Sequence, residues 1–296
     1  YVRLGNQYPE ATEYSDGEAA SRSVLGEILR NRGELQLAAE MFTVAADHYA
    51  SRIGESTNPP PQYRDLLAVN LSGFAQVMAI SGSGEGVPNE DSTESLEAAV
   101  EQWQLALQQI SPLVNVLNGR AVPQYVDDAA WIHTHLADVL WQLSKKGEAL
   151  ASAKRAAKLR SGLTSPQHLH NAAWLRVHSL VPGVRDAKLA VDLARQATKK
   201  APSNPDYQNT LAAAWLAAGN LKEAEAALAL AEKNRKAPSP ADQLVRSMVE
   251  REKKNEEKAD ELLAAAIKLA DETAPLNPKL LRLRLEAKVA SQSPPE

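Results

Sequence analysis

One spacing recurs along the chain and restricts its fold more than any other feature. A small residue is followed four positions later by a larger or equal one, and three positions after that by a second small one. Intervals of four and three place all three side chains on one stripe of a 3.6-residue helix. The six occurrences are Ala38-Phe42-Ala45, Ala99-Trp103-Ala106, Ala149-Ala153-Ala156, Ala190-Ala194-Ala197, Ala224-Leu228-Ala231 and Ala259-Leu263-Ala266.

Each stripe follows a break or an insert, and a second apolar helix precedes it. Gly33, Gly147 and Gly219 mark three of the breaks, and matching partner helices carry Leu25-Gly26-Leu29, Leu136-Ala137-Leu140 and Leu211-Ala212-Trp215. Pro278 to Ala290 reads as a single amphipathic helix after the last pair, typical of the cap that ends a stack of repeats. The pattern predicts an all-α chain of about six antiparallel helix pairs with a C-terminal capping helix.

These units resemble the tetratricopeptide repeat (TPR), whose length is about 34 residues. The resemblance covers residues 17–273 and is strongest in Asn204 to Lys236. It implies a right-handed superhelical solenoid with a concave wall that holds peptides. Residues 185–290 are also similar to the TPR region of large bacterial multidomain serine/threonine kinases, on the strength of Asn204-Pro205-Asp206, Gly219-Asn220 and Leu280 to Ala287. This second similarity implies a kinase domain upstream of Tyr1, although the chain itself carries no kinase motif.

The regularity of the helix pairs and the distribution of charged residues both differ between the two halves of the chain. We expect an N-terminal extension at 1–16, irregular acidic repeats with inserted loops at 17–124, regular TPR-like repeats at 125–273, and a capping helix with a frayed tail at 274–296. The inserts are a Gly-rich stretch from Ser81 to Pro88 and a connection from Ser111 to Pro123. Residues 1–144 hold seven Arg, no Lys and 19 acidic residues, a formal charge of −12, whereas residues 145–296 carry +8.

Composition excludes several classes of protein. The chain has no cysteine, so disulfides, thiolate metal sites and a cysteine nucleophile are ruled out. No run reaches the roughly 18 apolar residues of a membrane helix, and no signal peptide opens the sequence. A cytoplasmic protein is expected. The basic C-terminal end lacks the interleaved aromatic residues typical of nucleic-acid binding.

The concave wall of such a stack comes mainly from the first helix of each pair, so partner-binding residues are expected there. Trp131 and Trp174 are either anchors for a peptide or core residues between helices. The wall lacks the basic residues that grip a peptide's C-terminal carboxylate in some TPR domains. In register with the fifth pair, the inward positions are Trp131, His135, Asp138, Gln142, Gln167, His170, Asn171, Trp174, His178, Asp206 and Asn209.

Five of the six histidines lie between His133 and His178. Residues two apart on a helix point in nearly opposite directions, so at most one histidine per pair could join a metal site, for instance His135 and His170 with Asp138. Surface or groove histidines are the alternative. Acidic neighbours such as Asp127-Asp128 and Glu256-Glu257 are interpreted as negative charges at helix starts.

No nucleophile or cofactor motif stands out, so we expect no enzyme and no cofactor. The sequence predicts a protein–protein interaction scaffold that binds a protein or peptide in its groove, as the recruitment region of a larger bacterial signalling protein. The alternatives are a structural spacer or self-association module, in which the chain forms a homo-oligomer, and, more remotely, a metal-binding enzyme built on the histidines.

Overall fold

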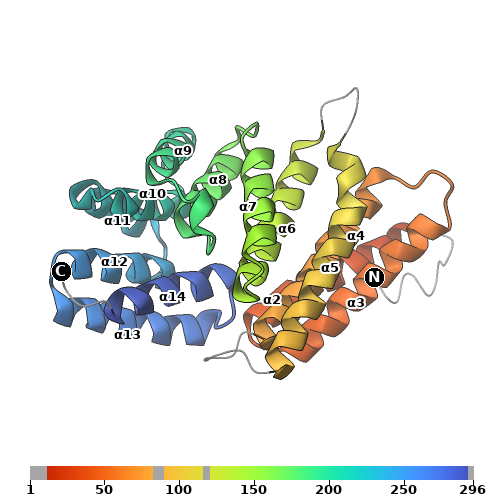
Figure 1. Cartoon of the computed structure of the whole chain (residues 1–296), viewed down its shortest axis with the longest axis horizontal. Helices are drawn as coiled ribbons and strands as arrows, with labels where there is room; N and C mark the ends of the chain where they lie inside the picture. Colours follow the sequence, from red (N-terminus) through yellow and green to blue (C-terminus); the bar gives the residue numbers. More distant parts are fainter. Residues whose placement is uncertain (1–11, 83–89, 116–120, 293–296) are drawn as a thin grey trace. The chain divides into compact units, whose positions relative to one another are not determined.

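The computed structural model describes residues 12–82, 90–115 and 121–292 of the 296. The chain separates into two compact units, unit 1 (Tyr1–Leu159) and unit 2 (Arg160–Glu296). Within each unit, helices that follow one another in the sequence pack side by side (Figure 1). The fold is all-α and TPR-like, with every described helix contributing to a stack of antiparallel pairs or to the helix that closes it.

Six helix pairs and a final helix account for the described residues, as the repeated spacing predicts. In unit 1 the pairs are α2 with α3, α4 with α5 and α6 with α7; in unit 2 they are α8 with α9, α10 with α11 and α12 with α13. The bounds are α2 Thr12–Asn31, α3 Leu35–Gly54, α4 Pro61–Gly82, α5 Glu90–Val114, α6 Pro123–Gln142, α7 Lys146–Arg160, α8 Pro166–His178, α9 Ala187–Lys200, α10 Pro205–Ala217, α11 Leu221–Asn234, α12 Pro240–Glu252, α13 Glu256–Thr273 and α14 Pro278–Gln292. A 3-10 turn, Pro182–Val184, precedes α9.

All eighteen residues of the six stripes are buried. Each keeps at most 9% of its surface exposed, and most keep none. Alanine at the ends of a stripe lets the paired helix approach closely, and the central side chain fills the space between neighbours. Phe42 shows how tight this packing is, because a Cβ added to Gly26 of α2 would lie 2.9 Å from the Phe42 ring, and one added to Gly73 of α4 would lie closer still.

Helix starts and turns follow local chemistry. Proline opens α6, α8, α10 and α12, where the missing amide hydrogen costs nothing. The side chain of Asn204 accepts hydrogen bonds from the amides of Asp206 and Tyr207 at the start of α10. Between the helices of four pairs lies one residue with positive φ: Gly33, Ser144, Gly219 and Lys254.

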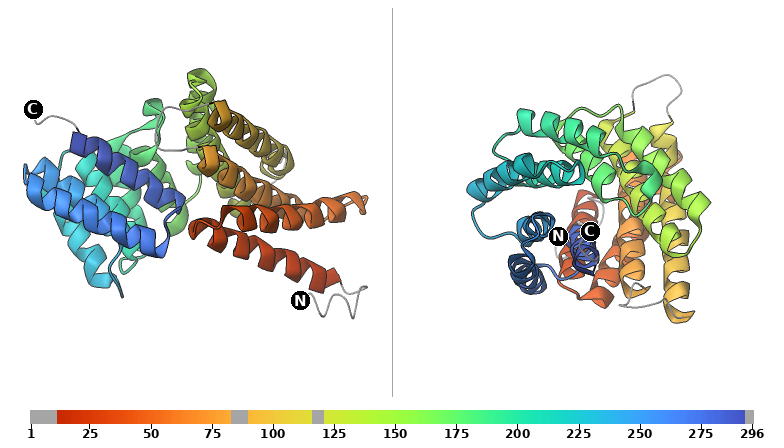
Figure 2. Two further views of the ribbon diagram at one scale, coloured as in Figure 1. Left: turned by 90° about the horizontal axis from the view of Figure 1, so that it is seen from below. Right: turned by 60° about the vertical axis from the view of Figure 1, so that its left-hand side comes forward.

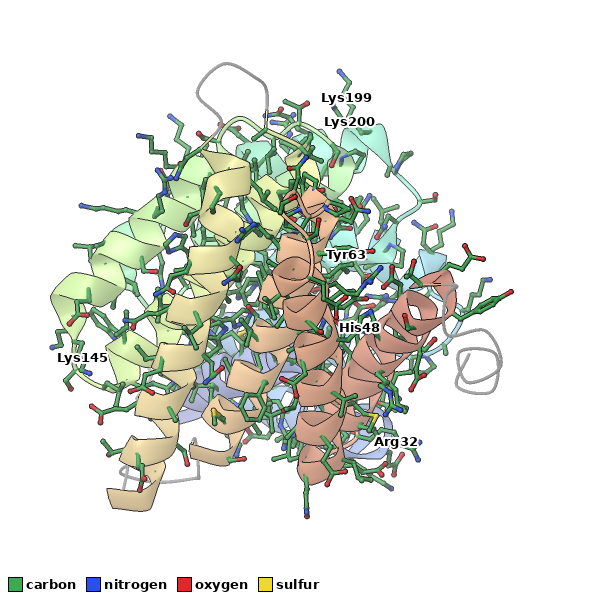
Figure 3. All side chains as sticks on the ribbon, turned by 90° about the vertical axis from the view of Figure 1, so that its right-hand side faces the viewer. Arg32, His48, Tyr63, Lys145, Lys199 and Lys200 are labelled. Atoms are coloured by element: carbon green, nitrogen blue, oxygen red, sulfur yellow. The ribbon has the colours of Figure 1, made fainter. Side chains whose placement is uncertain are left out.

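Unit 1 is held near its first helices by a polar junction as well as by apolar packing. Asp16 of α2 accepts a hydrogen bond of 2.7 Å from the Tyr63 hydroxyl and lies 2.7 Å from Nε2 of His48. Tyr63 belongs to α4 and His48 to α3, and both are labelled in Figure 3. The carboxylate of Asp16 therefore ties three helices together. Tyr49 and Leu67 form the apolar cluster beside it.

Unit 2 is closed by α14. Leu280, Leu283 and Ala287 of this helix join one apolar cluster with residues of α8, α10, α11, α12 and α13. Figure 2 shows the dark-blue helix α14 lying along the other helices of its unit, and α12 is the helix that it contacts most. The predicted capping helix is therefore confirmed, and it belongs to the core of unit 2.

Several expected boundaries differ from those of the structure. Helix α2 begins at Thr12, inside the segment expected as an extension, and α5 continues through Pro112 to Val114, inside the expected connection. Gly147 does not break the chain, because α7 already begins at Lys146 and Ser144 takes the positive φ. The units meet at 159/160, whereas regularity and charge change near 124 and 144. Residues 83–89, 116–120 and 293–296, where the rest of the inserts and the tail fall, lie outside the described residues.

Candidate partner-binding surfaces

His170, expected on an open wall, is buried. Only 4% of it is exposed, and its ring packs against Tyr207 of α10 with 5.0 Å between centroids. Burial, assisted by the nearby charges of Lys279, His178 and Arg160, lowers the pKa of His170 to about 3. The ring is therefore neutral in the physiological range, and its burial gives no support to the expected role in partner binding.

His178 is also covered, and the structure shows by what. Its Nδ1 lies 2.8 Å from Oε2 of Glu286, and its carbonyl oxygen accepts a hydrogen bond from Nε of Arg282, both on α14. Burial alone would raise the pKa of Glu286, but His178, Arg282 and Arg185 together hold it below its ordinary value. Trp174 also packs against the His178 ring, with 5.0 Å between centroids. At this place the inward face of α8 is occupied by the chain's own last helix.

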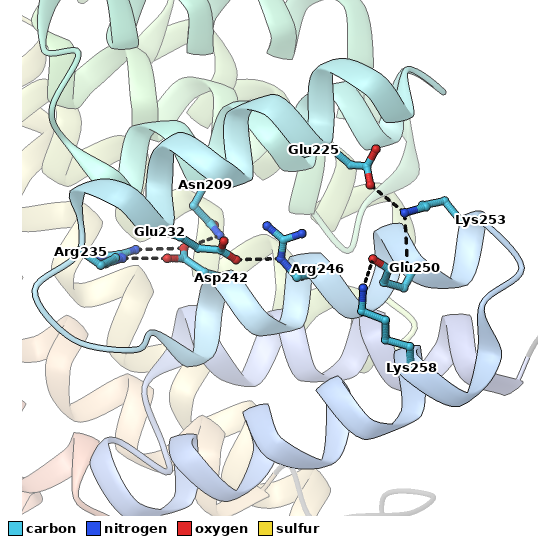
Figure 4. A network of polar contacts seen from close by, with 9 residues as sticks. All are labelled: Asn209, Glu225, Glu232, Arg235, Asp242, Arg246, Glu250, Lys253 and Lys258. Atoms are coloured by element: carbon cyan, nitrogen blue, oxygen red, sulfur yellow. Dashed lines mark hydrogen bonds and ion pairs between the residues drawn. The ribbon is translucent and has the colours of Figure 1, made fainter.

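Asn209 and Asp206 both take part in contacts that join α10 to the next pair. Asn209 is 7% exposed, and its Nδ2 donates a hydrogen bond of 2.9 Å to Oδ1 of Asp242 on α12. Arg235 completes the group by pairing with Asp242 at 2.9 Å and with Asp206 at 2.7 Å. Figure 4 shows Asn209 and Arg235 converging on Asp242. The side chain of Asn209 is thus used between helices, which gives no support to its expected role in partner binding.

Three other inward positions of unit 2 keep part of their surface accessible. Gln167 is exposed, accepts a hydrogen bond of 3.0 Å from the Tyr207 hydroxyl and donates one of 3.1 Å to Asn171. Asn171 and Trp174 are half-buried. They form a small polar edge on α8, beside the part of its face that α14 covers.

The four expected residues of unit 1 lie along one face of α6 and are here named the α6 row: Trp131, His135, Asp138 and Gln142. Trp131 meets His135 edge to face, with 4.4 Å between centroids, and His135 stacks over the buried Trp103 of α5 at 6.3 Å. Gln142 is exposed and the other three are half-buried. The row is an accessible aromatic, imidazole and amide surface whose rings are fixed by a buried tryptophan.

Next to the α6 row, two carboxyl groups face each other, and sequence reasoning missed this pair. Asp65 of α4 is 8% exposed, and its Oδ1 has no hydrogen-bond partner. Burial and the neighbouring carboxyl raise the pKa of Asp128 to about 7, and burial raises that of Asp65 to about 6. Asp128 lies in the second turn of α6, so its interpretation as a helix-start charge is wrong, whereas Glu256 and Glu257 do open α13. The signal in the sequence was weak, because the two residues belong to different pairs.

Unit 2 also has an open groove of about 900 Å³ between α9, α10 and α11. Leu211 and Trp215 form part of its floor, and Arg195 and Lys199 lie along the α9 side. Gln208, another lining residue, is 5% exposed and leaves its Oε1 without a hydrogen-bond partner. This groove lies outside the inward positions that the sequence singled out.

The histidines do not gather around a common point. His133 of α6 lies 2.9 Å from the Ser152 hydroxyl of α7, and burial, with the charge of Arg155, lowers its pKa to about 4. His135 belongs to unit 1 and His170 to unit 2. Among residues 12–82, 90–115 and 121–292, no three His, Asp or Glu side chains form a group that could hold a metal ion. None of the helices described there is long and apolar enough to cross a membrane.

Stacked antiparallel helix pairs with small-residue stripes define the chain as a TPR-like helical repeat protein. Similar solved structures include PilF of Pseudomonas aeruginosa (TM-score 0.44, 13% identity, covering 93% of this chain and 98% of that one). They also include a thermophilic TPR protein of Thermus thermophilus (0.40, 17%, 73% and 98%). A third is YrrB, a TPR protein with an unusual peptide-binding site (0.37, 19%, 82% and 99%). With TM-scores below 0.5, none of these likenesses identifies a partner or a function for this chain.

No family model matches the sequence, and no curated protein matches it. The similarity to the repeat region of bacterial kinases is not confirmed by these comparisons, and no catalytic relative is found among the structures just named. The accessible surfaces of the two units are therefore the basis for a functional proposal.

Proposed function

We propose that this chain is a non-catalytic protein-interaction scaffold and that the α6 row binds a protein or peptide partner. The observation that carries the proposal is that Trp131 and His135 stay partly accessible while stacked on buried Trp103. Aromatic side chains with few rotatable bonds supply large contact areas at a small cost in entropy, and they dominate the energetics of many interfaces. At the equivalent positions of α8, His178 is buried, whereas Trp174 is half-buried.

Site-specific crosslinking tests this proposal. A photoreactive amino acid placed at Gln142, at the exposed end of the row, is expected to capture a partner in cells. The same group at Lys154, exposed on α7, serves as the control. Adding Trp131→Ala should reduce capture from position 142 without loss of helical content. Equal capture from both positions, or none from 142, would show that the α6 row is not the binding surface.

We also propose that the scaffold is the recruitment region of a larger bacterial signalling protein that acts in the cytoplasm. The support is the resemblance of residues 185–290 to the repeat region of bacterial kinases. Reading the gene upstream of the codon for Tyr1 tests it, since a kinase domain is expected there and a gene without one would contradict the proposal.

Self-association is the competing function and has its own measurement. Light scattering of the purified chain is expected to give one monomer mass at all concentrations if the α6 row serves a different protein. A dimer that grows with concentration, and that Trp131→Ala abolishes, would instead assign the row to a second copy.

A further inference from the structure

Within the described part of the chain, the pair formed by Asp65 and Asp128 has no compensating positive charge. Nε2 of Gln124 donates to both carboxylate oxygens of Asp128, at 2.9 and 3.0 Å. No Lys or Arg among the described residues pairs with either carboxyl, and the nearby Arg64 donates instead to Gln109 of α5. Two facing carboxyl groups can hydrogen-bond to each other only when one of them carries a proton.

Unit 2 shows how the chain treats a buried carboxylate elsewhere. Asp242 lies between α10 and α12, the first helices of successive pairs, as Asp65 and Asp128 lie between α4 and α6. Asp242 is 3% exposed and receives both the Asn209 amide and the Arg235 guanidinium. A buried carboxylate without such partners is destabilising. The junction in unit 1 therefore lacks the cation that its counterpart in unit 2 contains.

The surroundings of the pair suit a cation that comes from outside the chain. Trp131 lies three residues after Asp128, on the same side of α6. An aromatic face beside carboxylates attracts ammonium and guanidinium groups. The acidic character of residues 1–144, at −12, adds a long-range attraction for a basic partner.

We propose that the Asp65–Asp128 pair, together with the neighbouring Trp131, is a binding site for a Lys or Arg side chain of a basic peptide segment. The proposal rests on the proposed function and specifies the partner that the α6 row receives. The incoming cation takes the place of the proton that the two carboxyls share. Asp65 on α4, and Gln124, Asp127 and Asp128 on α6, are the charged and polar groups that surround this position.

Below about pH 7 a proton must leave the pair as the cation binds, so affinity depends on pH. Below about pH 6 the pair keeps its proton and competes with the cation. Above about pH 7 both carboxyls are ionised when the cation is present, and binding should be tightest.

Calorimetry with hexalysine amide and the full chain tests the site, with the fully acetylated hexapeptide as the uncharged probe. At pH 8 hexalysine is expected to bind, and Asp128→Asn should weaken that binding about tenfold. Asp47→Asn is the matched control, because it removes the same charge from an exposed position on α3 and should change little. Asp65→Asn repeats the test from α4. Thermal melting should find both variants at least as stable as the parent, since each relieves an uncompensated carboxyl pair.

Carboxyl carbon NMR of the aspartates locates the effect, with the resonance of Asp128 expected to shift on adding hexalysine. Equal losses in Asp128→Asn and Asp47→Asn would show a diffuse acidic surface and overturn the site. A response of Asp128 to Mg²⁺ or Ca²⁺ at concentrations where hexalysine gives none would assign the pair to a metal ion and overturn it as well. Crosslinking from Gln142 does not depend on these charges. If it captures a partner while the carboxyl pair does not respond to hexalysine, the proposed function stands and only this site is overturned.

Discussion

At the scale of single residues, the turns between paired helices depend on backbone conformation more than on contacts. Gly219 has φ +75°, and a Cβ at this position would meet no atom within 4 Å. Ser144 has φ 60° at the equivalent turn of the third pair, where a side chain makes this conformation less favourable. The two turns therefore differ in strain and not in packing.

Exchanging these residue types should shift stability in opposite directions. Ser144→Gly is expected to raise the free energy of unfolding by about 0.5–1 kcal/mol, and Gly219→Ala to lower it by about 1 kcal/mol. Urea denaturation followed by circular dichroism measures both. A destabilised Ser144→Gly would mean that the Ser144 side chain contributes more than its strained backbone costs.

The carboxyl pair makes a second prediction at this scale. Because the pKa values of Asp65 and Asp128 are raised on folding, the folded state binds more protons than the unfolded one between about pH 4 and 7. Stability from this source is present at low pH and is lost as pH rises through 6 and 7. Unfolding of Asp128→Asn at several pH values should show a smaller loss over this interval than the parent. An identical pH profile would contradict the raised pKa values.

At the scale of elements, α14 is the helix whose role differs most from the expected one. A cap needs only one apolar face, but α14 also carries Arg282 and Glu286 into contact with His178. Its apolar side joins the largest cluster of unit 2. Helix α14 thus covers the last pair with its apolar side and also holds α8 through polar contacts.

Truncating two leucines of α14 should change stability by different amounts, because one is buried and the other is exposed. Leu283 is 3% exposed, so Leu283→Ala is expected to destabilise unit 2 by about 2–4 kcal/mol. Leu285 is 47% exposed, and Leu285→Ala should change stability by less than about 0.5 kcal/mol. Thermal and urea unfolding of both variants provide the comparison. Similar losses would place α14 outside the cooperative core.

At the scale of the whole molecule, each of the two units has apolar clusters of its own. The clusters around Tyr49 and Phe42 draw only on unit 1, and that containing Leu228 and Leu283 only on unit 2. A unit with its own core can fold by itself.

We expect a fragment of residues 160–296 to fold alone. It should give a helical circular dichroism spectrum and a single cooperative unfolding transition, because α14 closes its core within the fragment. Heteronuclear NMR measures the same property through dispersed amide signals. A collapsed fragment without cooperative unfolding would show that unit 2 needs residues of unit 1.

The helices were predictable from the sequence, whereas most of the site was not. Small residues at intervals of four and three are a local signal, and all eighteen proved buried. His178 and Asn209 were placed inward by repeat register, but Glu286 lies 108 residues from His178 and Asp242 lies 33 from Asn209. Contacts over such separations carry no periodic signal. The pairing of Asp65 with Asp128 escaped notice for the same reason.

The polar contacts between α14 and α8 restrict how a chain of this kind can change length by gene duplication. Glu286 and Arg282 reach His178 across the pairs that lie between α8 and α14. Inserting or deleting one pair there would move His178 by a whole repeat and remove its contacts with Arg282 and Glu286, which would keep their own ion pair. The contacts between α14 and α8 therefore favour three helix pairs as the length of unit 2.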